Sequence, residues 1–161
     1  MNTSDLIAVT SRSFSKNEKL INELKSRYKK IRLNEEGLSL SGDSLISFCK
    51  DANKVIVGLE KFNSEILEHL PNLKVISKYG VGLNNIDLAE LDSRGIKLGF
   101  TPGVNKRPVA ELTISLILLA LRRTHQSLDK IKNGIWSQER GNELYKKTIG
   151  VLGFGNIGSL L

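Results

Sequence analysis

Short β-branched runs alternate with amphipathic helical stretches through residues 1–100, and this alternation restricts the fold more than any other feature of the sequence. The runs that predict strands are Leu6–Val9, Ile31–Leu33, Val55–Leu59, Leu73–Ser77 and Ile96–Leu98. The stretches between them place their apolar residues at helical spacing, at about 17–29, 43–50, 64–70 and 86–93, and Ser64 is predicted to cap the third of them. Such alternation is typical of a parallel sheet with helices on both faces. We therefore predict an α/β, flavodoxin-like, doubly wound domain over residues 1–100.

Two loops interrupt this pattern, and ligands of such sheets bind in loops at the carboxyl ends of the strands. The first, Tyr79–Asn85, is rich in glycine and directly follows a predicted strand. It fits two interpretations equally well, a tight turn that needs unusual backbone angles or an anion site made of backbone N–H groups. The second, Thr101–Pro108, contains two prolines and is typical of a crossover between domains.

A long helix is predicted after the second loop, at about 109–123, with Pro108 in its first turn. Apolar residues cover nearly its whole circumference, which predicts burial on several sides at a domain or subunit interface. Glu111 lies near the helix N-terminus, where the helix dipole favours an acid, and fits a capping role as well as a ligand role.

A G-x-G-x-x-G motif follows the apolar run Thr148–Leu152, which predicts a strand. The motif consists of Gly153, Phe154, Gly155, Asn156, Ile157 and Gly158. In a dinucleotide site its glycines permit the sharp turn, the close approach of a pyrophosphate and the tight packing of the next helix. The N–H groups of Asn156 and Ile157 would then point at the phosphates. A plain tight turn is the alternative, but the position after a strand favours the dinucleotide site.

Composition and charge exclude several other classes. Hydrophobic residues make up 40% and charged residues 25%, as in a globular protein. The lone Cys49 favours a reducing, cytoplasmic compartment, and its apolar neighbours predict a core residue. The longest apolar run, Ile114–Leu121, is far shorter than the ~20 residues of a membrane span, and no signal peptide is evident. The net charge of +7 is scattered among acids, so we expect neither nucleic acid nor a membrane as partner.

Several motifs in a fixed order resemble the D-isomer-specific 2-hydroxyacid dehydrogenases, especially members similar to D-3-phosphoglycerate dehydrogenase. The segments that carry the resemblance are Ser77–Asp87, Arg94–Ile96, Thr101–Asn105, Val109–Glu111, Gly134–Trp136 and Lys147–Gly153. Over the first 70 residues only the βα rhythm agrees. The resemblance implies NAD-dependent hydride transfer between a D-2-hydroxy acid and a 2-oxo acid, and a homodimer in the full-length form. It leaves NADP open, includes 3-phosphoglycerate among the candidate substrates, and implies no metal.

The same resemblance implies the site residues. Backbone N–H groups of Gly80 and Gly82 would hold the substrate carboxylate, with Val81 also beside the nicotinamide. Lys78 stands where many relatives have arginine and would supply a point charge in place of a bidentate fork. Asn105 would be a further substrate residue. The cofactor would contact Val81, Gly153, Gly155, Asn156, Ile157 and Gly158. Departures from the family pattern, Asn84 for aspartate and Lys146 for glycine, leave the substrate open.

The family's catalytic arginine, glutamate and histidine would lie beyond Leu161, as would the acid that binds the ribose. His69 and His125 fall outside the matching motifs, and we expect both at the surface or at helix ends. Residues 101–161 are accordingly expected to be the incomplete start of a Rossmann NAD-binding domain, and the chain by itself to have negligible turnover. A second hypothesis is a non-catalytic binding or assembly module that dimerises through the 109–123 helix.

Overall fold

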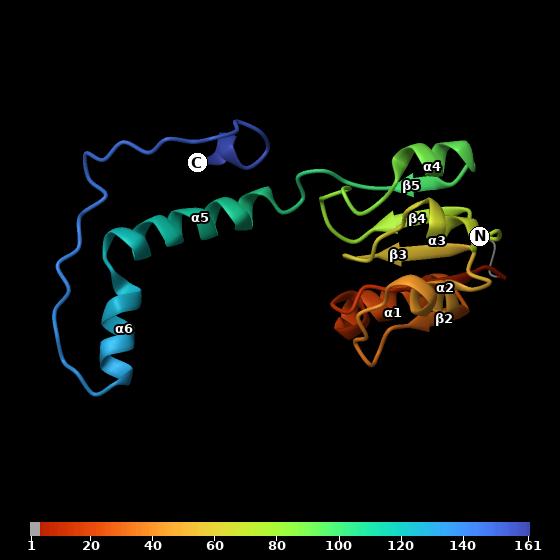
Figure 1. The fold of residues 1–161 in the computed structure, drawn as a ribbon, viewed down its shortest axis with the longest axis horizontal. Helices are drawn as coiled ribbons and strands as arrows, with labels where there is room; N and C mark the ends of the chain where they lie inside the picture. Colours follow the sequence, from red (N-terminus) through yellow and green to blue (C-terminus); the bar gives the residue numbers. More distant parts are fainter. Residues whose placement is uncertain (1–3) are drawn as a thin grey trace. The chain divides into compact units, whose positions relative to one another are not determined.

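The structure, a computed structural model, describes residues 4–161 (Figure 1). The chain forms two compact units, one that extends through Pro102 and one from Gly103 to Leu161. The first contains the whole sheet, and the second consists of two helices and a largely irregular C-terminal segment.

The first unit is built on a five-stranded sheet in the order β2-β1-β3-β4-β5, in which every neighbouring pair is parallel. Its strands are β1 (Leu6–Val9), β2 (Lys30–Leu33), β3 (Lys54–Val57), β4 (Val75–Lys78) and β5 (Lys97–Gly99). This is the strand order of flavodoxin-like doubly wound sheets. The predicted fold class is therefore confirmed.

Helices cover the two faces of this sheet unequally. They are η1 (Phe14–Lys16), α1 (Glu18–Arg27), α2 (Gly42–Cys49), α3 (Ser64–Glu68) and α4 (Leu88–Ser93). The connection from β1 to β2 runs in the opposite direction across the sheet from the later ones. Because parallel crossovers are right-handed, α1 lies on one face and α2, α3 and α4 on the other.

The main core fills the space between the sheet and the three helices on that second face. Alternate strand residues point into it, and its members include Ala8, Val55, Val57, Ile76, Leu45, Cys49, Leu67 and Leu91. Cys49 is 1% exposed, and burial raises the pKa of its thiol to about 12. The expectation that this cysteine is a core residue is thus confirmed.

Two local predictions in this unit were wrong. The predicted cap of α3, Ser64, is the first helical residue, and Asn63 caps the helix by accepting a hydrogen bond from the N–H of Ile66 at 3.3 Å. Asn63 has the extended backbone that an N-cap requires. The strand predicted to run to Leu59 ends at Val57, and Leu59 is 82% exposed in the loop that follows.

The second unit contains α5 (Lys106–Leu121), α6 (Thr124–Lys132) and a final turn, η2 (Gly158–Leu160). Pro108 lies in the first turn of α5, as predicted, whereas Glu111 lies beyond that turn and caps nothing. Burial on several sides is not observed, because Ala110 is the only residue of α5 that the described chain buries. Among residues 4–161 no helix is long and apolar enough to cross a bilayer.

The strand predicted at Thr148–Leu152 is absent, and the segment is irregular. A strand of a parallel sheet needs neighbours that accept and donate its backbone hydrogen bonds. No strand within residues 103–161 is available to pair with this run. Its apolar side chains are consequently exposed, Leu152 completely and Ile149 by 48%.

Candidate functional site

Three strands of the first unit end side by side at one edge of the sheet. The backbone N–H of Thr10, just after β1, donates to Ile56 at 3.0 Å, and that of Tyr79, just after β4, donates to Val57 at 2.8 Å. The loops that follow β1, β3 and β4 therefore emerge together at the carboxyl edge. In doubly wound sheets this edge is where ligands bind.

A carboxylate joins the first two of these loops. Oε2 of Glu60 accepts hydrogen bonds from Oγ1 of Thr10 at 2.8 Å and from the N–H of Gly58 at 2.9 Å. Thr10 is fully buried, and Asn34 fixes its carbonyl by donating from Nδ2 at 2.9 Å. The ends of β1 and β3 are thus held in a fixed arrangement.

Lys78 joins the β3 loop to the β4 loop. Its ammonium donates to the carbonyl of Gly58 at 2.5 Å and to Oδ1 of Asn85 at 2.7 Å, while Nδ2 of Asn85 donates to the carbonyl of Glu60 at 2.6 Å. Burial lowers the pKa of Lys78, and the nearby charge of Glu60 partly opposes that shift. An ammonium has three N–H donors, so one is left for a ligand.

The Gly80–Gly82 loop follows Lys78 and Tyr79 directly. Gly80 has a φ of +142°, a conformation that favours glycine, and a Cβ on Gly82 would lie 3.2 Å from Oδ1 of Asn84. The N–H groups of Gly80, Val81 and Gly82 donate to no acceptor within the described residues. The loop is therefore a strained turn and also a row of free donors, so its geometry is compatible with both interpretations.

In the second unit, Asn105 is the N-cap residue of α5, but its side chain makes no capping hydrogen bond. The G-x-G-x-x-G motif forms a turn with a φ of +95° at Gly153. A Cβ on Gly158 would lie 2.1 Å from the carbonyl oxygen of Gly153, so this turn tolerates only glycine at that position.

The rest of the motif is open enough for a phosphate. A Cβ on Gly155 would meet nothing within 4 Å, and the N–H groups of Asn156 and Ile157 have no acceptor in the described part of the chain. The predicted helix after the motif is limited to the single turn η2. These residues fit a pyrophosphate sterically and by hydrogen-bond chemistry.

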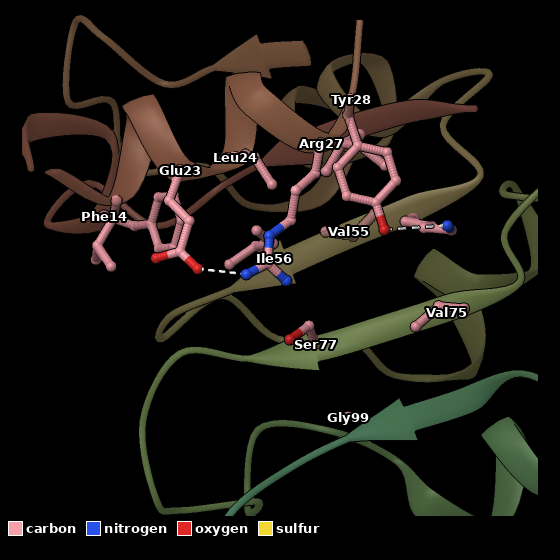
Figure 2. Close-up of a pocket in the computed structure, with 13 residues that line it drawn as sticks. Phe14, Glu23, Leu24, Arg27, Tyr28, Val55, Ile56, Val75, Ser77 and Gly99 are labelled. Carbon is pink, nitrogen blue, oxygen red and sulfur yellow. Dashed lines mark hydrogen bonds and ion pairs between the residues drawn. The ribbon is translucent and has the colours of Figure 1, made fainter. Parts of the chain in front are cut away.

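A cavity of about 500 Å³ lies beside α1 on the sheet face and not at the carboxyl edge (Figure 2). Its charged groups are already paired, Arg27 with Glu23 at 2.6 Å and Lys54 with Asp5 at 3.2 Å. Figure 2 shows the Arg27 side chain lying across the cavity above Ser77. No ionisable group there is left to bind a charged ligand, so we do not assign the site to it.

Neither histidine of the chain belongs to these loops. Nδ1 of His69 lies 2.8 Å from the carbonyl of Glu65 at the end of α3, and His125 is exposed at the start of α6. Both therefore lie at helix ends, as predicted. Residues 4–161 contain no cluster of three or more His, Cys, Asp or Glu side chains that would hold a metal ion.

The comparison with protein families identifies the chain. The profile described as D-isomer specific 2-hydroxyacid dehydrogenase, catalytic domain, matches residues 7–149. The chain belongs to this family. The resemblance predicted from the sequence motifs is thereby confirmed, and the family is one of NAD-dependent oxidoreductases.

Individual relatives agree with this assignment. The chain is 37% identical to a hydroxypyruvate reductase of Thermotoga maritima. The aligned region covers 74% of this chain and 40% of that protein. It is 38% identical to a D-3-phosphoglycerate dehydrogenase of Methanocaldococcus jannaschii, covering 77% of this chain and 24% of that one.

Solved structures of relatives share the fold. The TT0316 protein of Thermus thermophilus matches with a TM-score of 0.85 at 29% identity, covering 95% of this chain and 50% of that one. The NAD+-bound 3-phosphoglycerate dehydrogenase of Entamoeba histolytica matches with a TM-score of 0.70 at 25% identity, covering 98% of this chain and 49% of that one. The chain thus spans about half the length of these structures.

Sequence patterns did not predict the hydrogen-bond network around Glu60 or the role of the residues just after β1. Part of the clue was available, because Thr10–Ser13 directly follows a predicted strand and is rich in polar side chains, whereas Gly58 and Leu59 were assigned to the predicted strand Val55–Leu59. Only the structure shows that these two loops meet the one after β4.

Proposed function

We propose that this chain supplies the substrate-binding unit, and the first part of the NAD-binding unit, of an oxidoreductase that interconverts D-2-hydroxy acids and 2-oxo acids. The observation that carries the proposal is the set of free N–H groups at Gly80, Val81 and Gly82, beside the ammonium of Lys78. Such a set suits the carboxylate that all these substrates share. Relatives described as glyoxylate and hydroxypyruvate reductases support short acids as substrates.

In this mechanism the residues of the chain bind and orient. The Gly80–Gly82 loop holds the carboxylate, and the remaining N–H of Lys78 adds a point charge. Residues Gly153–Gly158 hold the pyrophosphate of NAD, whose nicotinamide supplies or accepts the hydride when it is bound. NADP remains an alternative, because the residue that reads the ribose is not among those assigned.

Amide chemical shifts of the full 161-residue chain during titration with glyoxylate test the carboxylate site. We expect the amides of residues 80–82 to shift and Val81→Pro, which removes one donor, to weaken binding by about tenfold. Val81→Ala keeps the N–H and serves as the matched control, and glycolamide, which lacks the charge, should not bind. Shifts that avoid residues 80–82 altogether would contradict the proposal.

A second candidate is an assembly module that dimerises through α5. The observation that favours it is the exposure of Leu112, Leu116 and Leu119, which are 58%, 54% and 44% exposed at helical spacing. Apolar stripes of this kind are typical of protein interfaces. A second copy of this chain presents the same stripe and would cover it. Such a homodimer is compatible with the enzymatic proposal.

A further inference from the structure

A second cavity, of about 320 Å³, opens at the carboxyl edge of the sheet beside the Gly80–Gly82 loop. We call it the Arg12 pocket. The residues that line it are Ser11, Arg12, Ser13, Gly58, Leu59, Glu60 and Tyr79. Tyr79 immediately precedes Gly80, so the pocket and the proposed carboxylate site share this wall.

Arg12 is the unpaired cation of the pocket. No acidic side chain or other hydrogen-bond acceptor in residues 4–161 pairs with its guanidinium, and the residue is exposed. The hydroxyls of Ser11 and Ser13 lie 3.3 Å apart beside it. A guanidinium with two neighbouring hydroxyls is a donor set that suits an oxyanion.

The acid in the pocket does not occupy this donor set. Oε2 of Glu60 is engaged by Thr10 and by the N–H of Gly58, and no hydrogen bond joins Glu60 to Arg12. The ammonium of Lys78 is close enough to Glu60 for the charge of that carboxylate to oppose the lowering of the Lys78 pKa by burial. The charge of Glu60 is therefore partly balanced by the ammonium of Lys78, whereas no described acid pairs with Arg12.

Several contacts hold the walls in place. The rings of Phe14 and Tyr79 pack edge to face with 5.2 Å between their centroids. A Cβ on Gly58 would lie 3.0 Å from Oγ and 3.1 Å from Cβ of Ser11, so glycine keeps the floor of the pocket open. The N–H of Phe14 donates to Oγ of Ser11 at 3.3 Å, which orients this hydroxyl.

We propose that the Arg12 pocket binds an anionic group at the far end of the substrate, a phosphoryl group or a second carboxylate. This inference rests on the proposed function, because the C1 carboxylate of the same molecule would occupy the Gly80–Gly82 loop. Two neighbouring anion sites then select acids with charge at both ends. The phosphoryl group is favoured between the two, because it accepts more hydrogen bonds than a carboxylate and three donor groups surround the pocket.

Binding of three acids to the full chain tests the inference: D-glycerate, 3-phospho-D-glycerate and D-malate. We expect 3-phospho-D-glycerate to bind at least about tenfold more tightly than D-glycerate. Arg12→Gln should abolish this preference and leave the affinity for D-glycerate unchanged. Arg12→Lys should keep part of it. Lys61→Gln, which removes an exposed cation outside the pocket, is the matched control for net charge.

The outcomes separate this inference from the proposed function. If D-glycerate shifts the amides of residues 80–82 but neither dianionic acid binds more tightly, the Arg12 pocket is wrong and the carboxylate site stands. A preference that survives Arg12→Gln also refutes the pocket. If D-glycerate fails to bind, the proposed function is wrong. A preference for D-malate alone supports the pocket with a carboxylate as its ligand.

Discussion

At the scale of single residues, each polar group at the carboxyl edge is either tied to the scaffold or free. Glu60 and Asn85 are tied, since their side chains bridge loops that follow different strands. The N–H groups of the Gly80–Gly82 loop and the guanidinium of Arg12 are free. This division explains why Lys78 serves two purposes: two of its hydrogen bonds hold the loop, and its third donor faces no described acceptor.

Cys49 gives a pH prediction at this scale. Its pKa is raised from 9.0 to about 12, chiefly by burial, so above pH 9 the unfolded chain loses this proton while the folded chain keeps it. Stability from this group is complete below the unfolded pKa and falls as pH rises through the window. Between about pH 8 and pH 10 the free energy of unfolding should fall by about 1 kcal/mol more in the wild type than in Cys49→Ala. Urea titrations at both values measure this, and equal slopes for the two proteins would refute it.

At the scale of elements, the apolar pattern of the sequence predicted whether a segment is a helix or a strand better than it predicted where that element begins and ends. All five strands of the sheet were expected, because short β-branched runs between helices have few alternatives. The run Thr148–Leu152 has the same pattern but forms no strand, because a strand also needs partners. Asn63 caps α3 because its backbone is extended. The sequence Asn63-Ser64 does not reveal which of the two residues has that conformation.

The apolar stripe on α5 gives the element-scale prediction. If a second copy covers it, the chain should elute as a dimer, and Leu116→Lys should shift it to the monomer because a charge would then be buried. Leu128→Lys is the matched control, since Leu128 on α6 has a similar exposure of 52%. Light scattering coupled to size-exclusion chromatography gives the mass. A wild-type monomer, or an equal effect of both substitutions, would rule out assembly through α5.

At the scale of the whole molecule, the described residues supply groups that bind anions. Each unit contains hydrogen-bond donors that suit an anion. Among the described residues, however, neither histidine pairs with a carboxylate near the Gly80–Gly82 loop. The family resemblance implies that a histidine paired with a carboxylate acts as the general acid–base on the hydroxyl or keto oxygen.

The chain by itself should accordingly bind short 2-oxo acids without reducing them. We expect no NADH oxidation above background with glyoxylate or hydroxypyruvate, measured by the loss of NADH absorbance. Glyoxylate binding to the same sample, followed through the amides of residues 80–82, is the positive control for a folded site. Turnover that depends on the purified chain would overturn this expectation.

The sequence by itself determined the family, the α/β fold and the two glycine-rich segments, because these depend on local order: strand runs, helical spacing and motifs in a fixed succession. Tertiary structure decided what lies at the carboxyl edge. Thr10, Glu60 and Lys78 are far apart in the chain, and only the parallel register of β1, β3 and β4 brings them within hydrogen-bond distance of a common network. The same register placed Arg12 and Tyr79 around one cavity, which no local pattern predicts.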